Sequence, residues 1–400
     1  MVSATTIAAT PPSHVEQTGA ARVLHHRARA FGAAIFLAAL FLPMIGAGLK
    51  WDPVTSSENR AMAKFPGMPK NFRQVRMFSD LFMGFYRDHF GFRNTLIRGL
   101  ALGRFHGGLG MDLSTNIIIG KDGFLFFPSS LHDGFLAERN LDPFSPAELD
   151  QWRQLLEKRN KYFTERGIPF IVVVPPDKQS IYTELMPEEF SRVGPKTRLD
   201  QLIDRLRETH SPVRLIDLRP ILLEAKKYRR IYFKTDTHWN DYGAFAAYPV
   251  ILDAIQSVLP GRKLIPQPMS DFIPRTTRKS GDLARYMDLY YEYNEDWLEL
   301  ERRVPFPRVS SPDNPYAMVV THGPDPKAPT LFMYHDSFTN YLGQFLGPNF
   351  STATWQWTNT LYGQEALNAK PDVVVDEFLE RLLYAPLPPD SEDIRDQKLP

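Results

Sequence analysis

The sequence predicts an α/β protein with a mostly parallel sheet and helices on both faces. Short apolar runs of strand length recur from about residue 115 onward, and segments with helical spacing of apolar residues separate them. Strands that alternate with helices favour parallel pairing, and ligands of such sheets bind at the carboxyl ends of the strands. The expected strands are 169–175, 213–219, 329–335, 352–357 and 371–378.

The expected helices are marked by their end residues. Ser145, Pro146 and Glu148 form a helix start, with a cap, a proline at the first helical position and an acidic residue that completes the cap. Gly167 is expected to end this helix. Two short strands around a Lys-Asp-Gly turn are expected within 116–127, before it. Further helices are expected at 197–210, at 220–228, from about 242 and from 338.

One N-terminal transmembrane helix is expected at residues 30–49, which carry no charge. About 20 apolar residues are enough to span a bilayer. Basic residues precede this run and only Lys50 follows it closely, so the chain after it is expected outside the cytoplasm. Residues 1–29 are then a disordered, basic cytoplasmic tail. A cleaved signal peptide is the alternative.

The rest of the chain is expected to comprise a connecting region at 50–110, a catalytic domain at 111–385 and a solvated tail at 386–400. The formal net charge of +1 gives no indication of nucleic-acid binding. The chain has no cysteine, which excludes disulfides, metal–thiolate sites and a cysteine nucleophile.

Catalytic chemistry is indicated by the segment 231–240, IYFKTDTHWN, which reads as a short strand followed by a polar turn. Asp236 and His238 are two residues apart, so in extended chain their side chains leave the same face. Ser337 lies where an apolar run gives way to a helix, and a helix N-terminus stabilises developing negative charge. A hydroxyl nucleophile needs a base, and the base needs an orienting group. We therefore expect a triad of Ser337, His238 and Asp236, with backbone N–H groups after Ser337 forming part of an oxyanion hole.

Two other interpretations use the same segments. Asp236 to His238 is also a common hydrogen-bonded turn, and Asp336 or Ser337 is a good helix cap. If the two turns adjoin, Asp236, His238, His335 and Asp336 are suitable ligands for zinc or manganese.

Three further residues are tentative substrate-binding candidates. Lys178 follows the end of an expected strand, and Asp282 lies in a Ser-Gly-Asp turn that is expected to line the cleft. Trp239 is expected either to stack on a sugar ring or to pack beneath the turn.

Seven motifs together resemble the family of alginate O-acetylation proteins AlgJ and AlgX, whose catalytic domain is similar to the SGNH hydrolases. The resemblance covers about residues 55–385. Its most specific part is the Thr-Asp-Thr-His-Trp segment followed by a later Asp-Ser-Phe. The motifs are ENRAMAKFP, DHFGFR, IIIGKDGFLFF, VVPPDKQSIY, YFKTDTHWNDYGA, SGDLAR and YHDSF.

The resemblance implies that Asp236 and His238 match the family's Asp-x-His pair and that Ser337 matches its nucleophile. The serine comes last rather than first, as in a circular permutation of ordinary SGNH enzymes. His335 stands where a glycine commonly precedes Asp-Ser. Asn240 and Asn340 are the nearby candidates for the SGNH asparagine.

The implied function is a periplasmic O-acetyltransferase, held in the inner membrane by a single helix. It moves an acetyl group through a serine acyl-enzyme to hydroxyls of an exopolysaccharide, alginate-like or other. A multispanning membrane acyltransferase is the implied acetyl donor, and no cofactor or metal is implied. The alternatives are a polysaccharide acetyl esterase with the same triad and a non-catalytic polysaccharide-binding or assembly scaffold.

Overall fold

The structure is a computed structural model that describes residues 19–49, 51, 63–107, 111–112, 116–130, 135–287, 289–290, 293–307 and 318–399. It divides into two compact units, Met1–Ile97 and Arg98–Pro400. The expected disordered tail lies outside the described residues as far as residue 18. Its basic part, from Arg22 to Arg29, is helical, because the Ala, Arg and Leu residues there are good helix formers.

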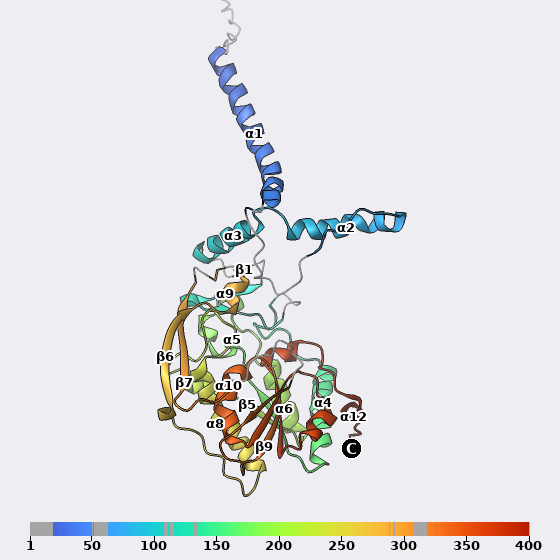
Figure 1. Cartoon of the computed structure of the whole chain (residues 1–400), viewed down its shortest axis with the longest axis vertical. Helices are drawn as coiled ribbons and strands as arrows, with labels where there is room; N and C mark the ends of the chain where they lie inside the picture. The colour runs from blue at the N-terminus through green and yellow to red at the C-terminus, as the bar shows by residue number, and fades with distance from the viewer. Residues whose placement is uncertain are drawn as a thin grey trace, which may run out of the picture. The chain divides into compact units, whose positions relative to one another are not determined.

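The first unit contains α1 (Gly19–Leu49), α2 (Phe72–Asp88) and the beginning of α3 (Arg93–Gly107), which are drawn in blue and cyan in Figure 1. Within α1, residues Arg29–Leu49 are long and apolar enough to cross a membrane, with a mean hydropathy of 2.2. A signal sequence near an N-terminus meets the same criteria. The N-terminus of α2 is capped by Asn71, whose Oδ1 accepts the N–H of Gln74 at 2.9 Å.

The second unit is built on a six-stranded sheet with the strand order β5-β4-β11-β9-β10-β8. Neighbouring strands pair in parallel, except that β8 pairs antiparallel with β10 at the edge. This confirms the predicted mostly parallel sheet. The strands are β4 (Phe170–Val174), β5 (Arg214–Asp217), β8 (Met318–His322), β9 (Thr330–His335), β10 (Thr352–Trp357) and β11 (Val373–Glu377).

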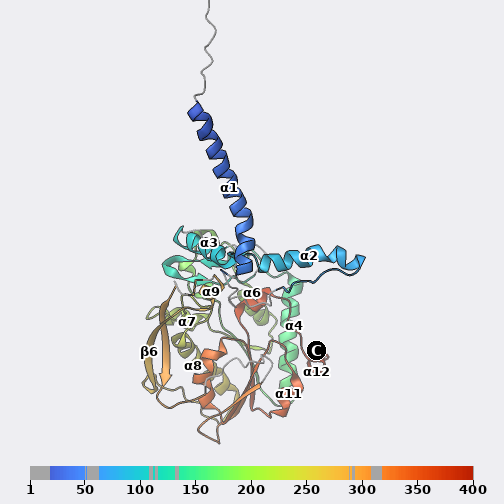
Figure 2. The same ribbon diagram turned by 45° about the horizontal axis from the view of Figure 1, so that its top comes forward.

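Helices cover both faces of this sheet, because successive side chains of its central strands point to opposite faces. In β4, Ile171 and Val173 join one apolar cluster, whereas Val172 and Val174 join the other. Figure 2 shows α7 and α8 on one side and α4, α11 and α12 on the other. The first layer comprises α5 (Lys178–Ile181), α7 (Arg219–Ala225), α8 (Asp241–Val258) and α10 (Thr339–Leu346), and the second comprises α4 (Pro146–Thr164), α6 (Arg198–Glu208), α11 (Gly363–Asn368) and α12 (Glu392–Arg395).

Two small sheets lie outside this arrangement. One is formed by β1 (Met111–Asp112), β2 (Ile117–Ile119) and β3 (Leu125–Phe126), of which β2 and β3 were expected. The other pairs β6 (Phe272–Lys279) with β7 (Glu295–Arg302) in antiparallel fashion, with α9 (Asp282–Tyr286) between them in the sequence. The short 3₁₀ turns are η1 (Lys121–Gly123), η2 (Thr183–Leu185), η3 (Glu188–Phe190), η4 (Met269–Asp271), η5 (Gly347–Asn349) and η6 (Glu380–Tyr384).

The prediction of a solvated tail at 386–400 is wrong for the residues described there. Ile394 is fully buried, and Asp390 lies 2.7 Å from the guanidinium of Arg159 in α4. The same guanidinium lies 2.8 Å from Asp376 in β11. A buried cation needs such carboxylate partners, and they hold the C-terminal segment against α4.

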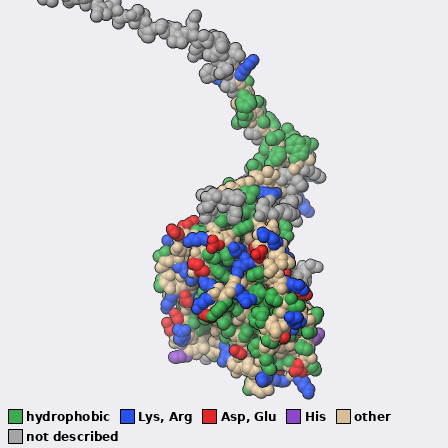
Figure 3. Space-filling model, turned by 90° about the vertical axis from the view of Figure 1, so that its left-hand side faces the viewer, with side chains coloured by type: hydrophobic (Ala, Val, Ile, Leu, Met, Phe, Trp, Pro, Cys, Tyr) green, Lys and Arg blue, Asp and Glu red, His purple; other side chains and the backbone are tan. Residues whose placement is uncertain are grey.

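The face of the molecule seen in Figure 3 carries Lys and Arg side chains interspersed with Asp and Glu side chains. This mixture agrees with the formal net charge of +1. It gives that face no extended field of one sign.

Candidate active site

The segment 231–240 is a loop between α7 and α8, and the predicted strand at its start is wrong. Tyr232 and Trp239 form an isolated antiparallel bridge, and the N–H of Asn240 donates to the carbonyl of Ile231 at 2.9 Å. The loop thus forms its own isolated bridge and does not join the sheet. Ser337, by contrast, follows the carboxyl end of β9, as predicted.

Three predicted residues come together in one hydrogen-bonded chain. The Nε2 atom of His238 lies 2.7 Å from Oγ of Ser337. Its Nδ1 atom lies 2.6 Å from Oδ1 of Asp236. Since an imidazole can accept a proton on one nitrogen while the other is held by a carboxylate, this geometry can activate the hydroxyl.

The loop and the nucleophile turn are joined by a tryptophan rather than by the reacting groups alone. Nε1 of Trp239 donates to the carbonyl of Phe338 at 3.0 Å, and Trp239 is fully buried. The ring of Phe338 lies 5.0 Å from the ring of His238. The alternative in which Trp239 packs beneath the turn therefore holds, and the proposed stacking on a sugar is wrong because the ring has no exposed face.

The charges of the pair are mutually stabilised. Burial by itself raises the pKa of Asp236, but the charge of His238 and the hydrogen bonds that Asp236 accepts outweigh burial, so its pKa is lowered. Burial lowers the pKa of His238, but the charge of Asp236 and its hydrogen bond outweigh that effect and raise it. His238 is thus a stronger base than a solvated histidine.

Asp282 positions this pair from the adjacent Ser-Gly-Asp turn. Its backbone N–H donates to Oδ2 of Asp236 at 3.0 Å, and its Oδ1 accepts the N–H of Thr237 at 2.8 Å. Gly281 allows this approach, because a Cβ atom there would lie only 2.4 Å from Cβ of Asp236. Asp282 thus lies beside the site and bonds to the 231–240 loop, and its role in substrate binding stays a prediction.

Lys178 and Glu295 hold the base of the loop. Nζ of Lys178 donates to the carbonyls of Leu125 and Lys234 at 2.7 and 3.1 Å. Because Lys178 is only 2% exposed, its predicted contact with substrate is wrong. Burial lowers the pKa of Lys178 to about 8, although Glu295 and Asp236 oppose this. Glu295 is also buried, and its carboxylate accepts the N–H groups of Lys234 and Thr235 at 2.8 and 2.7 Å.

The sequence analysis missed Glu295 and also Glu377, because nothing in their local sequence marks them. Glu377 ends β11 and is fully buried. Its Oε2 accepts the N–H of Asp336 and the hydroxyl of Thr339, each at 3.0 Å. Burial and the nearby charge of Asp336 raise the pKa of Glu377 well above its ordinary value. A buried acid thus supports the turn that carries Ser337.

Asp336, which directly precedes Ser337, also stabilises this turn. The carboxylate of Asp336 accepts the N–H groups of Phe338 and Leu379, each at 2.8 Å. Among the described residues, the N–H of Ser337 itself has no hydrogen-bond acceptor.

Asn240 does not provide a donor for an oxyanion. Its Oδ1 caps α8 by accepting the N–H groups of Tyr242 and Gly243, and its Nδ2 donates to the carbonyl of Arg230. Its expected match to the SGNH asparagine is therefore wrong. Asn340 lies in the first turn of α10, three residues after Ser337.

The four-residue metal site is not assembled. His335 is 2% exposed, and its Nδ1 lies 2.8 Å from the carbonyl of Asp336. Within the described ranges, the one group of metal-ligating side chains comprises Asp236, His238 and Asp282, whose ligand atoms lie within 4.8 Å of one another. In that group His238 and Asp236 are hydrogen-bonded to each other.

Comparison with known proteins adds the family context. A family model described as SGNH hydrolase-like domain, acetyltransferase AlgX, matches residues 117–313. The match includes Asp236, His238 and Asp282, and Ser337 lies beyond its end. The probable alginate O-acetylase AlgJ of Pseudomonas aeruginosa is 25% identical over 178 residues, which is 43% of this chain and 41% of that protein. AlgJ of Azotobacter vinelandii is 22% identical over 178 residues, 43% of this chain and 42% of that protein.

Two solved structures are also similar. The O-acetyltransferase domain of Pseudomonas putida AlgJ is 21% identical, with a TM-score of 0.46, and the match covers 68% of this chain and 92% of that chain. Bacillus cereus PatB1 is 15% identical, with a TM-score of 0.48 and coverage of 70% and 99%. The matched segment spans about two fifths of the length of the curated AlgJ relatives, 41% for the Pseudomonas aeruginosa protein. The family-model match over residues 117–313 and the AlgJ relatives show a similarity to AlgJ and AlgX proteins and to their SGNH hydrolase-like domain, as the motifs predict.

Proposed function

We propose that this protein is an O-acetyltransferase that acetylates hydroxyls of an exopolysaccharide through an acetyl-serine intermediate. The observation that carries the proposal is the bridge made by His238, 2.6 Å from Asp236 on one side and 2.7 Å from Ser337 on the other. The AlgJ relatives, named as probable alginate O-acetylases, support the acetyl group and the polysaccharide.

In the first half-reaction, Ser337 attacks the carbonyl carbon of the acetyl donor. A bond forms between Oγ and that carbon, and His238 takes the hydroxyl proton. Collapse of the tetrahedral intermediate breaks the bond to the donor's leaving group, which receives the proton from His238. In this scheme the N–H of Ser337 donates a hydrogen bond to the oxyanion.

In the second half-reaction, a sugar hydroxyl attacks the acetyl-serine. His238 removes the proton of that hydroxyl and returns it to Oγ as the ester bond to Ser337 breaks. Asp236 keeps the imidazole in the tautomer that presents Nε2 to the reacting oxygen and stabilises the imidazolium that forms. In each half-reaction His238 takes up one proton and gives it back, so this scheme requires no cofactor.

The N-terminal helix supports the proposed location and the proposed donor. A single-pass anchor at residues 30–49, with arginines on its N-terminal side, orients the second unit to the periplasmic side of the inner membrane. There it would receive acetyl groups from a multispanning membrane acyltransferase, since a periplasmic enzyme needs a donor that crosses the membrane.

The test uses the full chain in detergent with p-nitrophenyl acetate as donor. Intact-mass spectrometry should find one added acetyl group, which peptide mapping places on Ser337. The Ser337→Ala variant should remain unmodified, whereas Ser270→Ala, which removes an exposed serine in η4, should be modified like the parent.

The same experiment separates the alternative functions. Release of acetate by water, with no transfer to any polysaccharide, would indicate an esterase, because the triad is the same and only the acceptor differs. A second assay uses membranes that contain the acyltransferase in place of the ester. If the parent protein is acetylated in neither assay, the enzymatic proposal is refuted and a binding or scaffold protein is favoured.

A further inference from the structure

A cleft lies directly beside the nucleophile, and the mechanism above assigns no role to its walls. Ser337 and Asp336 form part of its lining. Phe127 and Ser129 line one side, after β3, and Trp357 and Asn359 follow the end of β10. The remaining wall is the segment 379–386, which contains Arg381 and Tyr384.

Trp357 is placed next to the nucleophile turn by the sheet register. It is the Cα partner of His335 in the pairing of β10 with β9, and the two rings lie 5.8 Å apart. The N–H of Thr358 donates to the carbonyl of His335 at 3.1 Å. Trp357 is half-buried, so part of its indole is open to the cleft. It offers an apolar ring face one strand away from the reacting serine.

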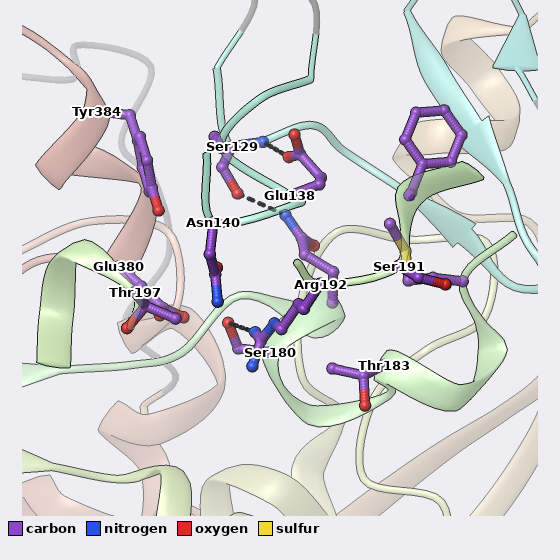
Figure 4. A pocket seen from close by; sticks show the side chains of 14 residues that line it. Ser129, Glu138, Asn140, Ser180, Thr183, Ser191, Arg192, Thr197, Glu380 and Tyr384 are labelled. Atoms are coloured by element: carbon purple, nitrogen blue, oxygen red, sulfur yellow. Dashed lines mark hydrogen bonds between the residues drawn. The ribbon is translucent and has the colours of Figure 1, made fainter. Parts of the chain in front are cut away.

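Hydrogen bonds tie residues on both walls of the cleft to the surrounding fold. Nε2 of Gln179 donates to the carbonyl of Phe127 at 3.0 Å and to the hydroxyl of Ser129 at 2.9 Å. Figure 4 shows a neighbouring polar pocket in which Ser129 and Tyr384 also take part. On the opposite wall, Leu379 is tied to Asp336 by a 2.8 Å hydrogen bond. A site that is pre-organised loses little entropy when a ligand binds.

The charged groups of the cleft do not favour an anionic ligand. Nε and Nη2 of Arg381 both lie on Oδ1 of the buried Asp177, at 2.7 and 2.6 Å. The pKa of Asp177 is raised to about 7, because burial and the charges of Glu380 and Glu138 outweigh the opposing charge of Arg381. Arg381, the cation of the described lining, is thus already paired with a buried carboxylate, and the other charged residue of that lining is Asp336.

The polar groups that remain are neutral hydrogen-bonding groups. Ser129 and Tyr384 carry hydroxyls, and Asn359 carries an amide. Oδ1 of Asn359 is buried and has no hydrogen-bond partner among the described residues. A pyranose ring needs this combination, because its C–H face packs on an aromatic ring while its hydroxyls exchange hydrogen bonds with neutral polar groups.

We infer that this cleft binds the acceptor and that the acceptor is a neutral polysaccharide, whose sugar ring packs on Trp357 beside Ser337. The inference rests on the proposed function and narrows its substrate class. A polyuronate carries one carboxylate per sugar, and the carboxylate of a sugar bound in this cleft would meet Asp336 and an arginine that is already paired. Specificity thus arises from repulsion as well as from contact.

The experiment compares two acceptors on the full-length acetyl-enzyme at pH 8. One is a neutral β-linked glucan or mannan oligosaccharide, and the other is a mannuronate oligosaccharide of equal length. Formation of the acetyl-enzyme from p-nitrophenyl acetate is measured first, without acceptor, and acetylated oligosaccharide is then quantified by mass spectrometry. If no acetyl-enzyme forms with this ester or in membranes that contain the acyltransferase, the proposed function fails before the cleft is tested.

With the acetyl-enzyme formed, the neutral acceptor should be acetylated at least about tenfold faster than the mannuronate. Trp357→Ala should raise the KM for the neutral acceptor about tenfold, and Trp357→Phe should recover part of this loss, since an aromatic face remains. A larger effect on acceptor KM than on acylation by the small ester distinguishes a binding role from misfolding.

A gain of function completes the test. Ala385→Lys adds a cation to the cleft at an exposed position and should raise transfer to mannuronate about threefold at low salt, an effect that salt should screen. Val304→Lys, at an exposed position outside the cleft lining, should leave both rates as in the parent. Preference for mannuronate, no transfer to any neutral oligosaccharide, or an unchanged KM in Trp357→Ala would each overturn the inference.

Discussion

The substitution Asp236→Asn tests the catalytic geometry most directly. Asparagine has nearly the same shape as aspartate, so the loop contacts to His238 and Asp282 can largely persist. What changes is the charge that faces Nδ1 of His238 at 2.6 Å. An amide that donates to Nδ1 would also favour the wrong imidazole tautomer.

The expected loss follows from the structure. Two unit charges with centres about 4 Å apart interact by ~4 kcal/mol at an effective dielectric constant of about 20. Because each 1.36 kcal/mol is a factor of ten, losing the carboxylate charge in the transition state slows acylation about 10³-fold. The wrong tautomer brings the expected loss to about 10⁴-fold. The acylation rate is measured from the release of p-nitrophenol in single-turnover conditions.

Asp282→Asn is the matched control. Asp282 accepts a hydrogen bond from the N–H of Thr237, which an amide oxygen can also accept, and its backbone N–H to Asp236 is unchanged. It should lose no more than about tenfold in acylation rate. The reasoning is refuted if Asp236→Asn stays within tenfold of the parent, or if both variants lose activity equally while thermal melting shows that both are folded.

Three further predictions concern pH, packing and stability. The raised pKa of His238 means that the acylation rate should climb with pH through a midpoint above about 6.5, and a pH–rate profile with a midpoint at or below that value would contradict it. By linkage, protonation of His238 stabilises the folded state fully below about pH 6.5, and this contribution is lost as the pH rises through the pKa of His238 in the folded state. Urea unfolding at several pH values measures the contribution. Gly281→Ala would place a Cβ atom 2.4 Å from Cβ of Asp236, and a displacement of Asp236 by about 1 Å should lower the acylation rate about 100-fold. Gly103→Ala is the control, because nothing lies within 4 Å of a Cβ atom there, and it should leave the rate unchanged. Equal effects of the two substitutions would contradict the role given to this contact. Arg159→Ala leaves Asp376 and Asp390 without their buried cation and should lower the free energy of unfolding by ~3–5 kcal/mol in urea titrations, and a loss below ~1 kcal/mol would show that the C-terminal segment is not held in this way.

The parallel sheet and most of its helices could be predicted because their signals are local. A short apolar run such as 371–378 predicts a buried strand. The cap formed by Ser145 and Glu148 is complete within four residues. The pair β6 and β7 gave no such signal. Much of β6 is exposed and polar, so its pairing with β7 depends on contacts that only the folded chain provides.

Among the site residues, Asp236, His238 and Ser337 could be selected from their chemistry and from a motif resemblance. Their contact could not be predicted, because Ser337 is far from the other two residues in the sequence. The buried hydrogen bond from Trp239 to Phe338 joins the two segments. The same gap explains two wrong assignments. Lys178 and Trp239 have side chains that suit substrate binding, but burial decides their role, and burial is a property of the packed layers.

The sequence by itself determined the fold class, the expected anchor and the three candidate catalytic residues, because strand and helix periodicity, apolar length and side-chain chemistry are carried by neighbouring residues. Only the tertiary structure decided which groups meet. It showed that Glu295 accepts the N–H of Thr235, that Gly281 leaves room for Asp236, and that Glu377 supports the turn of Ser337. These contacts join residues at least 40 positions apart, and their energies come from burial and geometry that no local pattern encodes.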